Sequence, residues 1–463
     1  MQLDEIKKVH FIGVGGIGLS AVAKLMLELG KEVSGSDLAP SVITNDLNKS
    51  GARIFISHDE KNLPVNCDLV IYSDAVRPDN VERLKAKTEG ITELSYFEFL
   101  SAFSKNYKTI AVTGTNGKTT TTALLGKALV DANVDPTVII GSRLEAFGGN
   151  LHVGSSDYFV VEADEYRAHM LNFDPWSIIL TNIDVDHLDF YHDLEDIISH
   201  FQKFINKLPP DGYLFYASED QNIKKLKVPK NSYSCGFSER ADYCVKNLKL
   251  VDEKSDFEVY YKSQYLDNFN LALIGDYNVL NALFVIAFCH QLKLDLAKVK
   301  KSLSDFTGLW RRFEILGYLK NLENILVISD YTHHPTAIAK TLKAARELYK
   351  NRRIILAFQP HQHNRTINLF NDFVTCFQDA DFIILNEIYD VAGRISAEEK
   401  SISSLDLVNK IISSNLKPKE NIIYSPNFET TKDLIMQKLQ PNDLLVIMGA
   451  GDIDNIAREL TLK

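Results

Sequence analysis

The sequence predicts an α/β protein of three domains, in which strands and helices alternate along most of the chain. At residues 9–29 and again at 108–131, an apolar β-type run ends in a glycine-rich turn and leads into a helix-compatible run. In the last third, four apolar runs of strand length each end in a polar cluster. Parallel strands gather their carboxyl ends at one edge of a sheet, so we expect ligand-binding residues at these ends.

The length and composition agree with this class. A chain of 463 residues is too long for one hydrophobic core. The net charge of −10 argues against a general nucleic-acid binder. The five cysteines are scattered without a C-x-x-C pattern, as in a reducing compartment. Because no apolar run reaches the roughly 18 residues of a membrane span and the start of the chain lacks a signal segment, we expect a cytoplasmic protein without membrane insertion.

The first strand is predicted at residues 9–12. The turn that follows, Gly13-Val14-Gly15-Gly16-Ile17-Gly18, is a full G-x-G-x-x-G fingerprint leading into a helix at residues 19–29. A second strand at residues 33–36 ends at Asp37, where such folds place an acid for a ribose. The pattern predicts a nucleoside diphosphate with its phosphates at the helix N-terminus. A tight turn that binds no ligand is the alternative.

The alternation continues to residue 106, where we place the end of the first domain. Short strands are predicted at residues 53–56, 69–72 and 91–93. Ser73 follows directly after one of them, at a strand end where open α/β sheets bind ligands. It therefore joins the candidate residues of the first glycine turn.

The second glycine turn lies in residues 111–120, with the sequence AVTGTNGKTT. Gly114 and Gly117 permit a tight bend that turns successive N–H groups toward one anion. The helix that follows adds the positive end of its dipole. Lys118 places a cation beside the β- and γ-phosphates, and the hydroxyl of Thr119 suits Mg²⁺. We interpret the segment as a shortened phosphate-binding loop for a nucleoside triphosphate.

Acidic residues follow the next strand, which is predicted at residues 158–161. They are Glu162, Asp164 and Glu165. A carboxylate at a strand end beside a phosphate loop is where a Mg²⁺ ligand belongs, directly or through water. Glu162 is the first choice, and of the other two one is expected to be structural.

A further strand, at residues 177–180, ends in the polar run 181–189. Asp186 and His187 in this run are candidates for a second metal ion. A single histidine is more often a structural group, but its place at a matching strand end favours the metal.

The stretch from residue 211 to 267 carries no chemistry that the sequence reveals. Its runs at 213–216 and 257–261 predict antiparallel strands. A helix then extends from residue 275 to 292, with Asn278 and Asn281 on one face. These amides fit either helix capping or contacts to adenine and phosphate.

The last third begins with Arg311 and Arg312, in a stretch that links two domains. Such arginines can reach a phosphate across a cleft or lie on the surface, and the sequence leaves both open. Strands predicted at 325–329, 354–358, 382–385 and 444–448 indicate a third α/β domain. The histidines at its strand ends lack the spacing of a zinc helix, so contacts to an anionic substrate are favoured.

Taken together, these motifs resemble those of the Mur ligases of peptidoglycan synthesis, and they stand in the same order. The resemblance covers nearly the whole chain and is greatest to the members that join L-alanine to UDP-N-acetylmuramate. The segments that carry it are 10–18 with 35–37, 114–122, 162–165, 181–183 with 186–187, 278–282, 311–313, 330–331 with 333–336, 358–361 with 365–366, and 449–451.

The resemblance implies three domains: a UDP-binding Rossmann-like domain at 1–106, a central ATPase domain at 107–308, and a C-terminal Rossmann-like domain at 309–463 that closes over the site. It also implies ATP and Mg²⁺ as cofactors, and UDP-N-acetylmuramate and L-alanine as substrates. The implied reaction phosphorylates a carboxylate to an acyl phosphate, which the amino group of L-alanine then attacks. No nucleic-acid partner is expected, and the protein is expected to be a monomer or homodimer.

The resemblance also assigns roles by position. For ATP these residues are Gly114, Thr115, Asn116, Gly117, Lys118, Thr119, Thr120, Asn278, Asn281, Arg311 and Asp330. For the sugar nucleotide and the amino acid they are Gly15, Gly16, Ile17, Gly18, Asp37, Ser73, Tyr331, His333, His334 and Arg365. The metal ligands are Thr119, Glu162 and His187, and catalysis is expected to depend on Lys118, Glu162, His187, Arg311 and His333.

Some positions depart from the family pattern. Asn116, Tyr277 and Thr332 stand where the L-alanine-adding members usually carry His, His and Gly, and residues 390–394 lack the family's acidic pattern. These departures leave the identity of the amino acid open. The alternatives are a ligase that recycles a murein tripeptide onto the same sugar nucleotide, a folate polyglutamate ligase, an NAD-dependent oxidoreductase with a P-loop module, and a non-catalytic nucleotide sensor.

Overall fold

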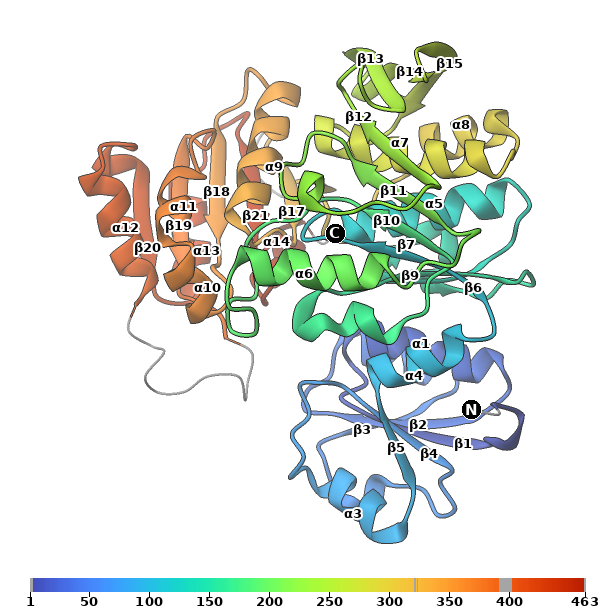
Figure 1. Ribbon diagram of the computed structural model, residues 1–463. Coiled ribbons are helices and arrows are strands. Elements are labelled where there is room, and N and C mark those ends of the chain that lie inside the picture. The colour runs from blue at the N-terminus through green and yellow to red at the C-terminus, as the bar shows by residue number, and fades with distance from the viewer. Residues whose placement is uncertain (1–2, 320–321, 323, 391–401, 462–463) are drawn as a thin grey trace.

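The computed structural model describes residues 3–319, 322, 324–390 and 402–461, and it confirms the predicted α/β class. Its strands form three sheets, one in each of three successive units of the chain. In Figure 1 the N-terminal unit lies at the bottom in blue, the central unit in the middle, and the C-terminal unit at the left in orange and red.

The N-terminal unit contains a parallel sheet with the strand order β3-β2-β1-β4-β5. The first glycine turn joins its central strand β1 to α1. The strands are β1 (Lys8–Ile12), β2 (Glu32–Asp37), β3 (Arg53–Ile56), β4 (Leu69–Tyr72) and β5 (Thr92–Ser95). The helices are η1 (Leu3–Glu5), α1 (Ile17–Glu28), α2 (Val42–Lys49), η2 (Glu60–Asn62), α3 (Val81–Glu89) and α4 (Tyr96–Ser104).

The central unit contains a ten-stranded sheet with the order β15-β14-β13-β12-β11-β10-β6-β9-β7-β8. The strands are β6 (Lys108–Thr113), β7 (Thr137–Leu144), β8 (Gly149–His152), β9 (Tyr158–Glu162), β10 (Ser177–Leu180), β11 (Tyr213–Ala217), β12 (Ser232–Gly236), β13 (Tyr243–Val251), β14 (Lys254–Tyr261) and β15 (Gln264–Leu271). The helices are α5 (Lys118–Asp131), η3 (Glu145–Phe147), η4 (Tyr166–Asn172), α6 (Leu194–Ile205), η5 (Ile223–Lys225), α7 (Asp276–Gln291) and α8 (Leu296–Ser304).

One expectation for this sheet was wrong. The run at residues 213–216 forms β11, which pairs in parallel with both β10 and β12. Antiparallel pairing applies to β13, β14 and β15, where the run at 257–261 lies. Strand direction depends on the crossover between strands, and α6 supplies a crossover between β10 and β11 that strand composition does not reveal.

The C-terminal unit contains a sheet with the order β16-β17-β21-β18-β19-β20, in which only the β16–β17 pair is antiparallel among the described strands. The strands are β16 (Glu314–Tyr318), β17 (Leu326–Asp330), β18 (Ile354–Phe358), β19 (Phe382–Asn386), β20 (Ile422–Ser425) and β21 (Leu444–Met448). The helices are α9 (Pro335–Leu348), α10 (His363–Asn368), α11 (Phe370–Thr375), α12 (Ser404–Ser413), η7 (Lys419–Asn421), α13 (Phe428–Lys438) and α14 (Asp454–Thr461).

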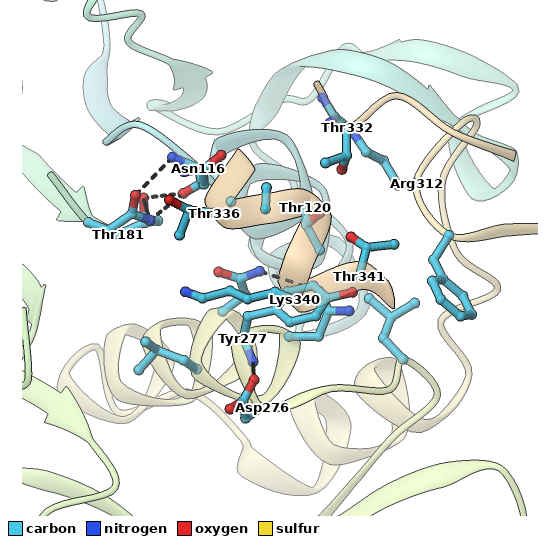
Figure 2. A pocket seen from close by; sticks show the side chains of 18 of the residues that line it. Asn116, Thr120, Thr181, Asp276, Tyr277, Arg312, Thr332, Thr336, Lys340 and Thr341 are labelled. Carbon is cyan, nitrogen blue, oxygen red and sulfur yellow. Dashed lines mark hydrogen bonds between the residues drawn. The ribbon is translucent and has the colours of Figure 1, made fainter. Parts of the chain in front are cut away.

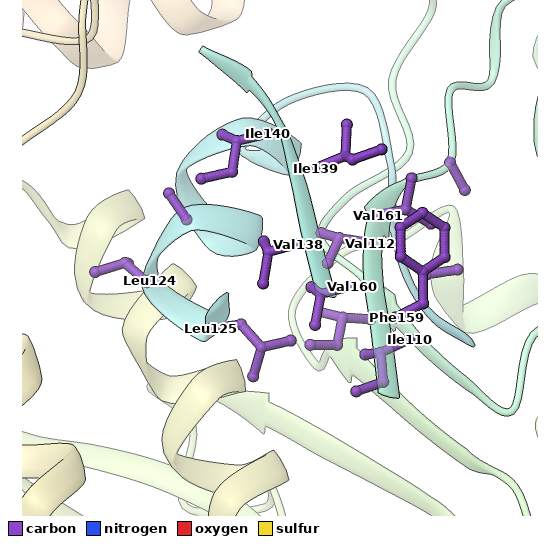
Figure 3. Packing of buried hydrophobic residues seen from close by; sticks show 14 of the residues in the cluster. Ile110, Val112, Leu124, Leu125, Val138, Ile139, Ile140, Phe159, Val160 and Val161 are labelled. Atoms are coloured by element: carbon purple, nitrogen blue, oxygen red, sulfur yellow. The ribbon is translucent and has the colours of Figure 1, made fainter. Parts of the chain in front are cut away.

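A continuous hydrophobic core connects the N-terminal and central units, whereas the C-terminal unit has separate cores. In Figure 3 apolar side chains from α5 and from β6, β7 and β9 fill the space between helix and sheet. Because one close-packed core spans the N-terminal and central units, it resists movement of these two units relative to each other. We therefore expect the first two units to move together and the C-terminal unit to move about the linker before β16.

A buried carboxylate organises the polar interior of the N-terminal unit. Glu82 on α3 is fully buried, and its oxygens accept hydrogen bonds from Ser36 and Asn62. Two histidines also lie near it, with His10 Nε2 at 3.4 Å and His58 Nδ1 at 3.7 Å. Burial acts to raise the pKa of Glu82, but the hydrogen bonds from these neighbours outweigh it and hold the pKa well below its ordinary value.

Replacing Glu82 with glutamine is expected to lower the free energy of unfolding by about 3 kcal/mol, because it removes the charge from a buried network of donors. Since the folded-state pKa is depressed, this stabilisation is present above the unfolded-state pKa of about 4.3 and is lost as the pH falls further. Thermal unfolding followed from pH 7 down to about pH 3 checks both points. The exposed Glu60→Gln change is the matched control, and equal melting temperatures for the two variants at pH 7 would contradict the prediction.

Candidate active site

The phosphate-binding turn joins β6 to α5, and its glycines are required by geometry. Gly114 and Gly117 have φ values of +124° and +88°, which side chains rarely adopt. A Cβ at Gly114 would lie 2.3 Å from Thr181 Oγ1, and one at Gly117 would lie 2.8 Å from Asn281 Oδ1. The turn is thus pressed against the end of β10 and the start of α7.

Lys118 begins α5 and is held over the turn. Its Nζ donates to the carbonyl oxygen of Gly114 at 2.6 Å and to Glu165 Oε2 at 2.6 Å. Burial acts to lower the pKa of Lys118, but the nearby carboxylates, Glu165 first, outweigh it and raise the pKa. A charged amine is therefore fixed at the mouth of the turn, where the sequence predicted a phosphate contact.

Two groups of ligand atoms suit a divalent cation. In the first, Thr119 Oγ1 donates to Glu162 Oε2 at 2.9 Å, and the N–H of Gly141 donates to the other carboxylate oxygen of Glu162. In the second, ligand atoms of Asp164, Glu165 and His187 all lie within 4.8 Å of one another. Carboxylate and hydroxyl oxygens dominate both sets, as hard cations such as Mg²⁺ require. The residues present therefore fit Mg²⁺.

A cavity of about 400 Å³ lies between α7 and α9, with Asn278 and Asn281 in its wall. The Asn278 amide is tied down, because its Nδ2 donates to the carbonyl oxygen of Ile274 at 2.8 Å. Figure 2 shows Thr336, Lys340 and Thr341 of α9 lying over Thr120 and Tyr277. Residues 116, 117 and 120 of the phosphate turn line the same cavity. Its position suits a base and ribose whose phosphates extend to the turn.

A second cavity, of about 520 Å³, is lined by residues of all three units. It shares Asn116, Gly117, Thr120 and Arg312 with the first cavity, so the two are adjacent. Of the predicted residues it brings together Gly16, Ile17, Gly18, Ser73, Thr115, Asn116, Gly117, Lys118, Thr119, Thr120, Glu162, His187, Arg311, Tyr331, His333, His334 and Arg365. Groups far apart in the sequence thus face one space.

Arg311 and Arg312 are adjacent in the chain but lie in different surroundings. Although Arg311 borders the larger cavity, its guanidinium donates to the carbonyl oxygens of Gly449 and Gly451 and is 8% exposed. The neighbouring Arg312 donates to Thr119 Oγ1 at 3.3 Å and lines both cavities. The backbone at Arg311 is in the left-handed region, with φ of +55°.

Other predicted residues have protein partners of their own. The N–H of Gly15 donates to Asp37 Oδ2 at 2.7 Å, so Asp37 fixes the first glycine turn instead of facing the larger cavity. Asp330 accepts hydrogen bonds from the N–H groups of Phe313 and Thr332 at the edge of the smaller cavity.

The C-terminal histidines and Arg365 close the far side of the larger cavity. Arg365 donates to both carboxylate oxygens of Asp186, at 3.1 and 3.3 Å, and is 7% exposed. Burial lowers the pKa of His333 well below its ordinary value, and the charge of Arg365 adds to this effect. Nδ1 of His333 is 3.1 Å from the carbonyl oxygen of Tyr331 and donates to it. The neutral ring therefore keeps a lone pair on Nε2.

Family models match the chain in three consecutive segments. They describe the Mur ligase family catalytic domain (residues 8–108), the Mur ligase middle domain (112–289) and the Mur ligase glutamate ligase domain (311–451). A UDP-N-acetylmuramate–L-alanine ligase from Clostridium tetani is 41% identical over 468 residues, covering 100% of this chain and 99% of the relative. The chain belongs to the Mur ligase family.

Solved structures of Mur ligases share the whole fold. The UDP-N-acetylmuramate–alanine ligase of Thermotoga maritima has a TM-score of 0.82 at 30% identity, and 98% of each chain is covered. A murein peptide ligase from Psychrobacter arcticus has a TM-score of 0.73 at 23% identity, again covering 98% of each chain, which shows the fold alone. Within the described residues, no helix has the length and apolar character needed to cross a membrane.

The three departures from the Mur ligase pattern gather at one place. Asn116, Tyr277 and Thr332 all line the smaller cavity, and Figure 2 shows them with Arg312 around it. The backbone of Asn116 is fixed on both sides, since its N–H donates to Asn182 Oδ1 at 3.0 Å and its carbonyl oxygen accepts from Asn182 Nδ2 at 2.7 Å. Of the segment 390–394, residues 391–394 lie outside the described residues.

Exchanging the two arginines for alanine separates their roles in this Mur ligase. Arg312→Ala is expected to lower kcat/KM for ATP about 100-fold, because it removes a cation beside the phosphate turn, and to leave the melting temperature unchanged. Arg311→Ala is expected to lower the free energy of unfolding by about 2 kcal/mol, because buried carbonyl oxygens lose their donors. Steady-state kinetics and thermal unfolding of both variants test this, and the reverse pattern would contradict the assignment.

Proposed function

We propose that the protein is an ATP-dependent ligase that joins L-alanine to the lactyl carboxylate of UDP-N-acetylmuramate, in the synthesis of peptidoglycan precursors. The observation that carries the proposal is the single cavity at which the first glycine turn, the phosphate turn and the C-terminal strand ends meet. The relatives at about 40% identity over the whole chain support the choice of substrates.

The chemistry explains why three units must meet. A carboxylate is a poor acyl donor, since oxide would have to leave. Transfer of the γ-phosphoryl group of ATP to a carboxylate oxygen gives an acyl phosphate, from which phosphate can leave. The amino group of L-alanine then attacks the carbonyl carbon and forms an amide, with ADP and phosphate as the other products. Negative charge concentrates at the phosphoryl group in the first step, so fixed cations there supply most of the catalysis.

On this proposal the central unit, residues 107–308, holds ATP. Lys118 and Arg312 supply fixed positive charge to the phosphates. Asn278 and Asn281 line the base and ribose cavity. Thr119, Glu162 and His187 would hold Mg²⁺, which when bound neutralises charge on the phosphoryl oxygens.

The outer units, residues 1–106 and 309–463, hold the other substrates on this proposal. Gly16, Ile17, Gly18 and Ser73 face the diphosphate of the sugar nucleotide from the N-terminal unit. His333 faces the incoming amino acid, where the lone pair on Nε2 of its neutral ring can accept a hydrogen bond from the attacking amine.

The test is a panel of substrates with product mass as the readout. Phosphate release from ATP is expected to require UDP-N-acetylmuramate and L-alanine together, with a product heavier than the sugar nucleotide by one alanyl residue. A product formed instead with the tripeptide L-Ala-γ-D-Glu-meso-diaminopimelate would identify a recycling ligase. Phosphate release without any amino acid, or oxidation of NADH, would contradict ligation itself.

A further inference from the structure

The C-terminal unit contacts three consecutive residues of the central unit, Asp184, Val185 and Asp186, and each contact is of a different kind. Thr336 Oγ1 at the start of α9 donates to Asp184 Oδ2 at 2.8 Å. The side chain of Val185 packs against the C-terminal hydrophobic core, and His334 Nε2 donates to its carbonyl oxygen at 3.1 Å. Arg365 pairs with both carboxylate oxygens of Asp186. We call these contacts the clasp. Together they fix the backbone of residues 184–186, and not merely one side chain.

The next residue in the chain is His187, whose backbone is in the left-handed region with φ of +56°. This conformation is costly for a residue with a side chain and persists where the surroundings impose it. On the N-terminal side, residues 184–186 impose this conformation, because the N–H of His187 donates to Asp186 Oδ1 at 2.8 Å. On the C-terminal side the carbonyl oxygen of His187 accepts from the N–H groups of Phe190 and Tyr191.

Residues 184–186 are also hydrogen-bonded to the phosphate turn. The N–H of Asp184 donates to Thr115 Oγ1 at 2.8 Å. Asp184 therefore bonds the phosphate turn through its backbone and the C-terminal unit through its side chain. The orientation of His187 thus depends on both the phosphate turn and the C-terminal unit.

We propose that Asp184, Val185 and Asp186 are positioning residues, and that their capture by Thr336, His334 and Arg365 sets His187 in place to complete the Asp164–Glu165–His187 cation site. This rests on the proposed ATP-dependent function. The site beside Glu162 has no bond to residues 184–186: Thr119 and Gly141 bond Glu162, and its contact with the C-terminal unit is a separate one, from Arg312 to Thr119 Oγ1. The clasp therefore controls one cation site and leaves the other formed.

The test removes one hydrogen bond of the clasp by changing its donor in the C-terminal unit, Thr336. Thr336→Val deletes the hydroxyl that bonds Asp184 and keeps the side-chain shape, and Thr336→Ser restores the hydroxyl. Thr375→Val is the matched control, because Thr375 lies on α11 and its hydroxyl bonds the carbonyl oxygen of Asp372 in its own helix. Mn²⁺ binding to the full chain is measured by electron paramagnetic resonance with a non-hydrolysable ATP analogue present. The ion at His187 is recognised by its ¹⁴N coupling, which His187→Ala removes.

We expect two tightly bound Mn²⁺ ions in the unchanged protein. Thr336→Val is expected to weaken the ¹⁴N-coupled ion about 5-fold, as loss of one such hydrogen bond would, and to leave the other unchanged. Thr336→Ser and Thr375→Val are expected to retain both. Equal affinities in Thr336→Val and the unchanged protein, or equal weakening of both ions, would overturn the inference. Absence of nucleotide-dependent Mn²⁺ binding in the unchanged protein would instead contradict the proposed function.

Discussion

Replacing Lys118 with methionine is expected to lower kcat/KM for ATP by at least about 1,000-fold, or about 4 kcal/mol of transition-state stabilisation. The amine is the cation fixed closest to the phosphate turn, held by Gly114 and Glu165. Methionine keeps a stem of similar length, so the change isolates the charge. A fixed charge in a site that excludes water is worth more than one that must be oriented during the reaction.

The fold is expected to survive this change. Burial raises the pKa of Glu165 above its ordinary value, and the charge of Lys118 opposes this rise. Without the lysine charge this pKa rises further, so Glu165 takes up a proton and leaves no unpaired buried charge. Unchanged thermal unfolding together with the kinetic loss supports the assignment, and Lys203→Met on α6, which is exposed, is the control. A loss of less than about 10-fold would remove Lys118 from the phosphate site.

Replacing Glu162 with glutamine is expected to lower kcat about 100-fold or more at ordinary Mg²⁺ concentrations, and to raise the Mg²⁺ concentration needed for half-maximal rate. Glutamine can still accept from Thr119 and Gly141 through its amide oxygen but carries no charge for the cation. Burial raises the pKa of Glu162, against the hydrogen bonds from Gly141 and Thr119 and the charges of Arg312 and Lys118. Magnesium titrations of the rate provide the measurement.

The exposed Glu145→Gln change is the control for this prediction. It makes the same chemical change in the same unit and is expected to leave both kcat and the Mg²⁺ dependence unchanged. A Glu162→Gln enzyme with the unchanged Mg²⁺ dependence would show that the carboxylate is structural.

The local backbone around the phosphate turn was predictable from the sequence. The strand, glycine turn and helix around Gly114, Gly117 and Lys118 are contiguous, so backbone rules are enough to place them. The class of fold followed from the same repeated pattern. The carboxylate at the end of β9 followed from the rule that ligand sites lie at the carboxyl ends of parallel strands.

The parts that depend on distant residues were not predictable in the same way. Arg311 and Arg312 are adjacent and chemically identical, and nothing in their sequence shows that Arg312 is the one that bonds Thr119. The pair formed by Asp186 and Arg365 joins residues 179 positions apart, and no local pattern indicates it. Which groups bind ligands and which bind each other is settled by the folded chain.

In the proposed reaction, the carboxylate of the sugar nucleotide is activated by direct transfer of the γ-phosphoryl group of ATP. The most direct test uses UDP-N-acetylmuramate labelled with ¹⁸O in both carboxylate oxygens, incubated with ATP and L-alanine. One labelled oxygen bridges carbon and phosphorus in the acyl phosphate and leaves with phosphorus when the amine attacks. We predict one ¹⁸O in each inorganic phosphate formed, measured by mass spectrometry, and one retained in the amide product. Label in AMP, or phosphate without label, would contradict direct phosphoryl transfer to the carboxylate.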